Sequence, residues 1–177
     1  SLGREVVLTR EPGGVDTAEN IRNLIMRNQT DSLSEALLFA AARREHLLKK
    51  VVPALESDKI VICDRFVGSS IVYQGIVGNA DINTILNINK AVIGDYIPDI
   101  TLVLQMDIEE ALNRIHQNNR ETNRFDNQSL EYHKSIEKAY ARLDSFSIML
   151  PLLYINAAQS PEDVFKESLH KIKRIMN

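Results

Sequence analysis

The sequence predicts an α/β fold, in which a parallel sheet is flanked by helices. Three observations lead to this prediction. Short β-branched or apolar runs alternate with longer segments of helical period, as in successive βα units. The 177 residues, 44% of them hydrophobic, suffice for one ordinary domain but are too few for two independent ones. No low-complexity tract, internal repeat or Ser/Gly-rich linker interrupts the chain, so we expect a single domain over residues 1–177.

Four short apolar runs are the candidate strands. They lie at residues 5–8, 59–63, 101–105 and 152–155. In doubly wound parallel sheets, ligands bind at the carboxyl ends of the strands. The residues that directly follow these runs are therefore the first candidates for a functional site.

Helix starts are marked by an oxygen-bearing side chain followed three residues later by a carboxylate. Four such pairs occur: Asp16/Glu19, Ser32/Glu35, Asp107/Glu110 and Ser160/Asp163, the last with Pro161 at the first helical position. A long helix is predicted over residues 34–55, where Pro53 should end or kink it. A further helix should cover residues 83–93 and stop at Gly94.

Composition excludes several classes of protein. A net charge of −3 argues against a general polyanion or nucleic-acid binder, so phosphate binding would need a local cluster of arginines. The single cysteine, Cys63, excludes an internal disulfide and a multi-cysteine metal site. No signal-peptide pattern and no apolar run of about 20 residues occurs, so we expect a cytoplasmic protein that does not associate with membranes.

The first two predicted strands end in charged motifs. The first runs into Thr9-Arg10-Glu11-Pro12-Gly13-Gly14, which is either a plain turn or a site that presents an arginine and a glutamate. The second ends in Asp64-Arg65-Phe66. There a carboxylate could hold Mg²⁺ and a guanidinium could bind phosphate oxygens, although a surface ion pair explains the same residues.

Two further segments carry candidate ligand-binding residues. Phe39 and Arg43 lie four apart and so on one helix face, where a ring could stack on a nucleobase while the arginine bonds a base carbonyl. This combination suits thymine, but Phe39 could equally belong to the core. The polar segment from Arg114 through Arg120 to Arg124 is typical of either a lid over a nucleotide or a solvated loop.

Taken together, the motifs and their order resemble bacterial thymidylate kinase over nearly the whole chain. The matching segments are residues 9–14, 38–46, 64–66 and 69–75, Pro98-Asp99, and Asn123-Arg124-Phe125-Asp126. The resemblance implies a nucleoside-monophosphate-kinase fold of the P-loop type and transfer of the γ-phosphoryl group of ATP to dTMP, giving dTDP for dTTP synthesis. It also implies Mg²⁺ as cofactor and a homodimer.

The resemblance further implies a role for each matching residue. Arg10, Arg22 and Arg65 would hold the dTMP phosphate, and Asp64 would organise Mg²⁺. The base and sugar would be bound by Phe39 stacking on thymine, Arg43 at its 4-carbonyl, Gln74 and Ser70 at the base edge, and Glu11 and Tyr73 beside the deoxyribose. Arg120 and Arg124 would be the catalytic arginines of a lid at about residues 118–127.

One departure from the family pattern is large. Family members open with a strand and a Gly-rich P-loop that ends in Gly-Lys-Ser/Thr, and the sequence contains no such motif. In the family, that first strand lies at the sheet centre, between the strands that correspond to residues 59–63 and 101–105. We therefore expect an N-terminally incomplete copy of a working enzyme, in which phosphoryl transfer is impaired if the P-loop is truly missing.

Two alternatives stay open at the level of sequence. One is a related nucleoside or nucleotide kinase that acts on another base or on the nucleoside. The other is a non-catalytic remnant that keeps the dTMP pocket for sensing or assembly.

Overall fold

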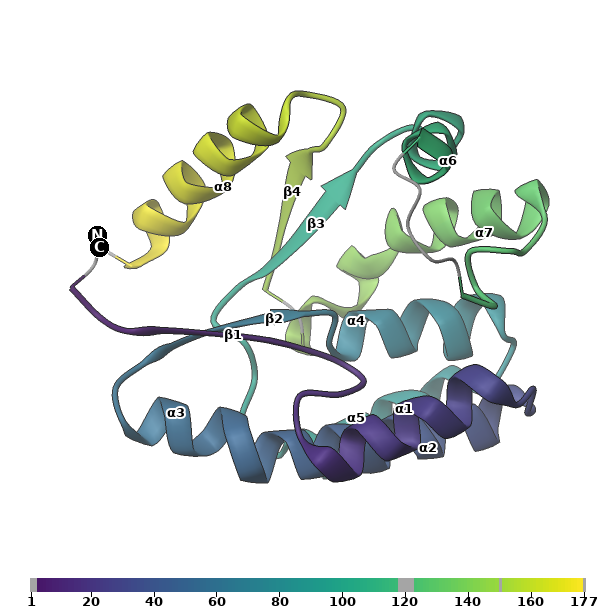
Figure 1. The fold of residues 1–177 in the computed structure, drawn as a ribbon, viewed down its shortest axis with the longest axis horizontal. Helices are drawn as coiled ribbons and strands as arrows, with labels where there is room; N and C mark the ends of the chain where they lie inside the picture. Colours follow the sequence, from purple (N-terminus) through teal and green to yellow (C-terminus); the bar gives the residue numbers. More distant parts are fainter. Residues whose placement is uncertain (1–2, 118–122, 150, 177) are drawn as a thin grey trace. The chain divides into compact units, whose positions relative to one another are not determined.

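The computed structural model describes residues 3–117, 123–149 and 151–176 (Figure 1). The chain forms two compact units, Ser1–Tyr96 and Ile97–Asn177. Each unit contains a pair of parallel strands with helices beside it, which confirms the predicted α/β class. Among the described residues, no helix is both long and apolar enough to cross a lipid bilayer.

The first unit is built on β1 (Val6–Arg10) and β2 (Ile60–Asp64). The two strands are parallel, in a register that pairs Val6 with Ile60 and Arg10 with Asp64. Both were predicted to within two residues of their observed bounds. Because the last residues of the two strands, Arg10 and Asp64, pair with one another, the carboxyl ends of the strands lie side by side.

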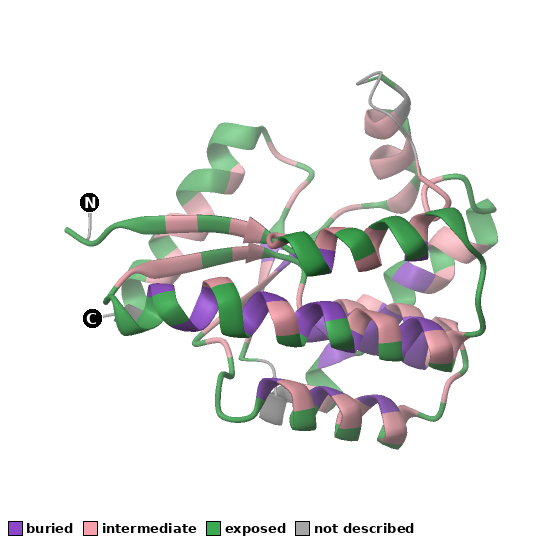
Figure 2. Cartoon of the chain, turned by 60° about the horizontal axis from the view of Figure 1, so that its bottom comes forward, coloured by how far each residue is buried: buried purple, intermediate pink, exposed green. Residues whose placement is uncertain are grey.

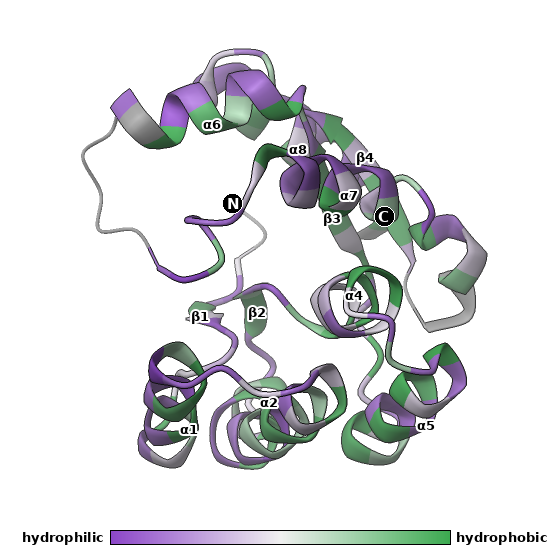
Figure 3. Ribbon diagram, turned by 90° about the vertical axis from the view of Figure 1, so that its right-hand side faces the viewer, coloured by the Kyte–Doolittle hydropathy of each residue, from purple (hydrophilic) through white to green (hydrophobic). Residues whose placement is uncertain are grey.

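The helical layer of this unit contains α1 (Asp16–Arg27), α2 (Ser32–His46) and α5 (Ile82–Ile93), which lie next to one another (Figure 3). The helix α4 (Val67–Ser70) continues into a π-helical turn, Ile71–Val77. Figure 2 shows the buried residues concentrated in the helices. The largest buried apolar side chains of these helices include Ile25, Ile71, Ile85 and Ile93.

The long helix predicted around Pro53 is continuous but changes its winding. After α2 it passes through a π-helical turn, Leu47–Val51, and ends with α3, Val52–Glu56. The Val52 N–H donates to the Leu47 carbonyl, five residues back rather than four. Pro53 has no N–H and crowds the preceding turn. The wider turn therefore lies where the proline disturbs the α-helical bonds, and the helix ends three residues later.

Two of the four predicted helix caps are confirmed and two are wrong. Asp107 accepts from the N–H groups of Glu109 and Glu110, at 2.9 and 3.2 Å, and Ser160 Oγ accepts from the Asp163 N–H at 3.2 Å. By contrast, the N-cap of α1 is Val15 and its side chain caps nothing, so Asp16 is the first helical residue.

The N-cap of α2 is Asp31 rather than Ser32. The Asp31 carboxylate accepts from the N–H groups of Leu33 and Ser34, each at 3.0 Å. The Ser32 hydroxyl donates instead to the Gly78 carbonyl at 2.7 Å. At the other end of the layer, α5 stops as predicted, with Gly94 at a φ of +57°.

The second unit is built on β3 (Thr101–Gln105) and β4 (Leu152–Asn156), which are parallel and pair Thr101 with Leu152. Its helices are α6 (Ile108–Gln117), α7 (Leu130–Tyr140) and α8 (Pro161–Met176), and a 3₁₀ segment covers Leu143–Met149. Helix α8 packs on β4, where Lys171 Nζ donates to the Tyr154 carbonyl at 2.6 Å. Both strand predictions in this unit are confirmed to within one residue.

The strands of the first unit are unusually open for parallel strands, which are normally buried on both faces. No residue of β1 or β2, both of which are fully described, is buried (Figure 2). The Leu8 side chain is 71% exposed and its register partner Ile62 is 52% exposed. One face of this strand pair is therefore apolar and accessible to solvent.

Candidate functional site

The ends of β1 and β2 bring together four of the predicted site residues. Arg10 and Asp64 are register partners, and the Glu11 N–H extends the ladder by donating to the Asp64 carbonyl at 2.9 Å. Both Arg10 and Asp64 are exposed. Arg65 follows with a φ of +66°, so the chain turns sharply directly after β2. An exposed carboxylate thus stands between two arginines at one edge of the strand pair.

Beneath this edge, Glu11 and Arg43 form a buried ion pair. Arg43 Nε donates to Glu11 Oε2 at 2.6 Å, and the two side chains are 2% and 3% exposed. The Arg43 guanidinium also donates to Asn89 Oδ1 and to Ser70 Oγ, the latter at 3.3 Å. It lies 5.1 Å from the centre of the Phe66 ring. Its N–H groups are therefore directed by acceptors from three separate segments, the turn after β1, α4 and α5, which holds the plane of the guanidinium.

The second oxygen of Glu11 has its own partner. His46 Nδ1 lies 3.0 Å from Glu11 Oε1, and His46 Nε2 lies 2.7 Å from Thr9 Oγ1. The imidazole is fully buried. His46 lies in the segment 38–46 that resembles the family, but no role was predicted for it. Its spacing of three from Arg43 on the same helix was the one indication that the two side chains share a face.

The phosphate-binding candidates surround the turn after β1. The Arg10 guanidinium pairs with Glu19 Oε1 at 2.9 Å, and Arg22 Nη1 donates to the Pro12 carbonyl at 3.2 Å. The turn needs glycine, because Gly14 has a φ of +84° and a Cβ there would lie 2.6 Å from Thr9 Oγ1 and 2.8 Å from the His46 ring. The Glu11–Pro12 peptide bond is cis.

Glu19 acts in this turn rather than as part of a capping box. It accepts from the Gly14 N–H at 2.9 Å as well as from Arg10. The capping pattern located Glu19 near the start of α1, but it gave no indication that Arg10 would be its partner.

The remaining base-site candidates differ in exposure. Gln74 is buried, and its Nε2 donates to Glu35 Oε1 at 2.7 Å. Because a carboxylate can only accept, the NH₂ side of this amide faces Glu35. Phe39 and Tyr73 are half-buried, and the Tyr73 ring centre lies 5.4 Å from Arg65 Cζ. The role of Glu35 as a partner of Gln74 was missed, since its position suggested only a helix cap.

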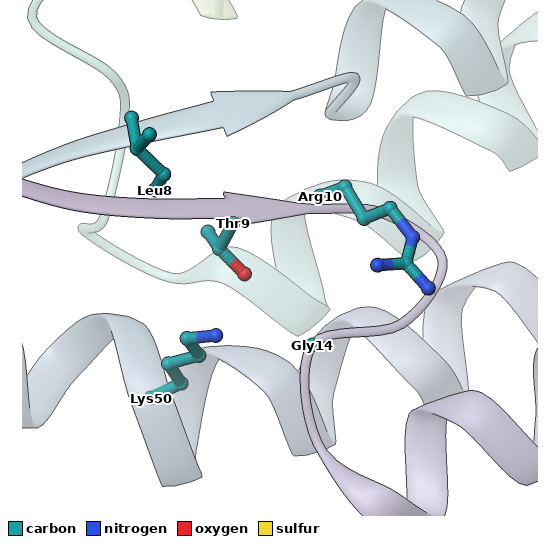
Figure 4. A pocket seen from close by; sticks show the side chains of 5 residues that line it. All are labelled: Leu8, Thr9, Arg10, Gly14 and Lys50. Atoms are coloured by element: carbon teal, nitrogen blue, oxygen red, sulfur yellow. The ribbon is translucent and has the colours of Figure 1, made fainter.

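A pocket of about 260 Å³ opens beside the end of β1 and is lined by Leu8, Thr9, Arg10, Gly14 and Lys50 (Figure 4). Figure 4 shows Thr9 and Lys50 directed toward one another across the space between β1 and the long helix, while Leu8 points to the opposite side of the strand. Lys50 adds a positive charge that sequence reasoning did not identify.

Three possible metal-ligating groups converge at the buried cluster. The ligand atoms of Glu11, His46 and Cys63 lie within 4.8 Å of one another. The Arg43 guanidinium already neutralises Glu11 at 2.6 Å. Burial, and secondarily the negative charge of Glu11, raises the pKa of the Cys63 thiol to about 12. The group therefore forms a hydrogen-bonded ion pair beside a protonated thiol, and the exposed Asp64 carboxylate is the better-suited oxygen ligand for Mg²⁺.

The lid candidates belong to the second unit. Arg120 lies outside the described residues, as does the predicted lid segment up to residue 122. Arg124 Cζ lies 4.2 Å from the centre of the Phe125 ring. The loop is braced by Asp126 Oδ2, which accepts from Asn123 N and Nδ2 at 3.0 and 2.7 Å.

Arg114 lies before the predicted lid segment and binds backbone carbonyls beyond β4. Its guanidinium donates to the carbonyls of Ala157 and Ala158, at 2.9 and 3.1 Å, and to Glu110 at 2.7 Å. Arg114 thus ties α6 to the segment that follows β4.

The strand ends place arginines and a carboxylate above a buried arginine and amide, as expected for a nucleoside monophosphate kinase, whose substrate carries a phosphate and a polar base. Comparison with known proteins agrees. The family profile described as thymidylate kinase matches residues 1–168, and this chain belongs to the thymidylate kinase family.

Individual relatives support this assignment. A thymidylate kinase from Geobacillus thermodenitrificans is 42% identical over 171 residues, which cover 94% of this chain and 76% of the relative. One from Bacillus velezensis is 47% identical over 145 residues, covering 80% of this chain and 68% of the relative. The crystal structure of thymidylate kinase from Ehrlichia chaffeensis superposes with a TM-score of 0.73 at 34% identity, covering 95% of this chain and 80% of that one.

Proposed function

We propose that the protein transfers the γ-phosphoryl group of ATP to dTMP. An oxygen of the dTMP phosphate attacks the γ-phosphorus while the bond to the bridging oxygen of the β-phosphate breaks, so that dTDP and ADP form. The observation that carries the proposal is the buried Arg43, held by Glu11, Asn89 and Ser70 directly beneath the exposed Arg10 and Asp64. This arrangement would bind a neutral base edge and a phosphate in one substrate.

The roles implied by the resemblance are kept as part of this proposal. Arg43 and Gln74 would hydrogen-bond thymine with Ser70 at the base edge, Phe39 would stack on it, and Glu11 and Tyr73 would lie beside the sugar. The charged groups outside the buried cluster, Arg10, Arg22 and Arg65, would bind the phosphate. Arg10 would then exchange or share its bond to Glu19.

Asp64 would hold Mg²⁺, directly or through water, and the cation would neutralise charge on the phosphates. The exposure of the Asp64 carboxylate at the end of β2 fits a hard cation that prefers oxygen ligands. Arg120 and Arg124 would stabilise charge that develops on the transferred group. We further propose that the protein works as a homodimer in the cytoplasm.

Dissociation constants for dTMP test the proposal most directly. We expect Arg43→Ala to weaken dTMP binding, whereas Arg124→Ala should slow transfer in a coupled ATP-to-dTMP assay with less effect on dTMP affinity. Arg43→Ala also strands the buried Glu11 carboxylate, at a cost of about 3–5 kcal/mol. Arg43→Lys, which keeps the positive charge, is the variant to use if the alanine variant does not fold.

Arg44 provides the matched control. It neighbours Arg43 on α2 but is exposed and donates only to the Val92 carbonyl at 3.0 Å among the bonds described for it. Arg44→Ala should leave dTMP affinity unchanged. Equal losses of affinity and turnover in both Arg43→Ala and Arg124→Ala would contradict the division of roles.

The assay also separates the two alternative functions. Preference for dCMP, AMP or thymidine over dTMP would favour a related kinase. In a protein that carries a P-loop, tight dTMP binding without any transfer would favour a non-catalytic binding protein.

A further inference from the structure

We infer that His46 is a positioning residue for dTMP binding, which acts by holding the Glu11 carboxylate and, through it, Arg43. The inference rests on the proposed function and extends it to a residue that contacts neither base nor phosphate in that proposal. Its basis is an unbroken chain of contacts that runs from Thr9 through His46 and Glu11 to Arg43.

The donor and acceptor chemistry assigns a tautomer to the imidazole. Glu11 as a carboxylate can only accept, so His46 Nδ1 carries a proton and donates to Glu11 Oε1 across 3.0 Å. In the neutral ring Nε2 is then the acceptor, and the Thr9 hydroxyl donates to it across 2.7 Å. Thr9 on β1 therefore holds the tautomer in which the imidazole can support Glu11.

The contact from His46 to Glu11 matters because, among the described residues, each Glu11 oxygen has one hydrogen-bond partner. His46 holds Oε1, and Arg43 Nε holds Oε2 at 2.6 Å. The terminal torsion of a glutamate is otherwise broad, so loss of one anchor lets the carboxylate turn. The turning carboxylate would carry the Arg43 guanidinium away from the plane set by Asn89 and Ser70.

Loss of the His46 hydrogen bond to Glu11 would be costly because the cluster is buried. Glu11, Arg43 and His46 are 4%, 2% and 0% exposed, so water cannot readily replace a missing donor. The Gly14 turn leaves little free space, because a Cβ on Gly14 would lie 2.9 Å from His46 Nε2. The imidazole, which belongs to the last residue of α2, is thus packed against the Gly14 turn in one orientation.

Two substitutions distinguish positioning from simple packing. His46→Asn can place its amide nitrogen near the former Nδ1 and so keep a donor for Glu11. His46→Gln places its amide near the former Nε2 and keeps a partner for Thr9, but leaves Glu11 Oε1 without its donor. We expect His46→Gln to raise the dTMP dissociation constant about tenfold, and His46→Asn to restore it to within about threefold of wild type.

Isothermal titration calorimetry with dTMP measures these constants, and thermal unfolding followed by circular dichroism shows whether each variant is folded. Equal dTMP affinity in both folded variants, whether weakened or unchanged, would overturn the positioning role. If His46→Gln does not fold, Thr9→Val decides. It removes the hydroxyl with little change of shape, and wild-type affinity in that variant would contradict the inference.

A double-mutant cycle tests the route of action. If His46 acts through Glu11, then His46→Gln should weaken dTMP binding far less in a Glu11→Gln background than in the wild type. Additive losses would contradict the inference. A wild-type protein that fails to bind dTMP would instead refute the proposed function, and the positioning role with it.

Discussion

Cys63 illustrates at the scale of one residue how the buried charges affect their neighbours. Its thiol hydrogen-bonds to the Arg65 carbonyl at 3.1 Å and lies close to Glu11. Burial is the largest influence on the thiol, followed by the negative charge of Glu11, and together they raise its pKa to about 12 from an ordinary 9.0. The thiolate is thereby suppressed at neutral pH, which makes Cys63 a poor nucleophile in the folded state.

This shift predicts a pH dependence of stability. Between the ordinary pKa and the raised one, the unfolded chain loses the thiol proton while the folded chain keeps it, so the free energy of unfolding falls as pH rises from 9.0 toward about 12. Cys63→Ser keeps a hydroxyl donor for the Arg65 carbonyl but lacks this titration. Urea unfolding of both proteins at about pH 8 and about pH 10.5 should show a steeper decline for the wild type. Parallel declines would contradict the prediction.

At the scale of the element, the start of α2 shows how adjacent polar residues divide their tasks. Asp31 caps the helix, while Ser32 donates to Gly78, which follows the π-helical turn Ile71–Val77. The bonds from Ser34, its side chain first, lower the pKa of the Asp31 carboxyl below 3.8. The cap is therefore strongest when Asp31 is ionised.

We predict that Asp31→Ala lowers the thermal midpoint by a few degrees at neutral pH, because two helix N–H groups lose their acceptor. Since the folded pKa lies below the ordinary 3.8, this stability is present above 3.8 and is lost as pH falls through the folded pKa. The difference in thermal midpoint between Asp31→Ala and the wild type should therefore disappear at acid pH.

Asp16→Ala is the comparison for this experiment. Asp16 was predicted to be the cap of α1, but the N-cap is Val15 and Asp16 is the first residue inside the helix. Its substitution should change the midpoint less than Asp31→Ala does. Equal effects of the two substitutions would contradict the assignment of the caps.

At the scale of the whole molecule, the chain combines a well-buried helical layer with open strands. Val6, Leu8 and Ile62 are 48%, 71% and 52% exposed, and Leu8 and Ile62 are neighbours by register. Exposed apolar patches of this kind bind hydrophobic dyes or partners more readily than isolated residues do.

We therefore predict that Leu8→Gln lowers the fluorescence of the dye ANS bound to the native protein, with little loss of stability because the side chain is already exposed. Leu48→Gln is the control. Leu48 is 48% exposed, but it lies on the long helix, where Arg44 occupies the position four residues earlier. Equal dye fluorescence for wild type and Leu8→Gln would contradict the prediction.

Much of this fold could be predicted from local pattern. The strands at 6–10 and 60–64 follow from short apolar runs. The stop of α5 follows from Gly94, whose φ of +57° and ψ of −125° together form a conformation that only glycine readily adopts. The strand-end motifs also located Arg10, Glu11, Asp64 and Arg65, because parallel strands align their carboxyl ends. The family could be identified because several such motifs occur in one order.

The partners within the site could not be predicted in this way. His46 and Glu11 are 35 residues apart, Gln74 and Glu35 are 39 apart, and Arg43 and Asn89 are 46 apart. No local pattern encodes which of many polar residues will meet across such separations. The same limit explains why the N-cap of α2 was wrongly predicted at Ser32. The Ser32 hydroxyl donates instead to a carbonyl 46 residues away.

By itself, the sequence determined the α/β class, the strand positions and the kinase family, since these depend on short-range periodicity, turn chemistry and ordered motifs. Only the tertiary structure decided that Arg43 is buried against Glu11, that His46 supports the same carboxylate, and that Glu35 orients Gln74. The physical reason is that burial removes water as a competing partner. Each buried polar group must then find its donor or acceptor in whichever distant segment packing brings within reach.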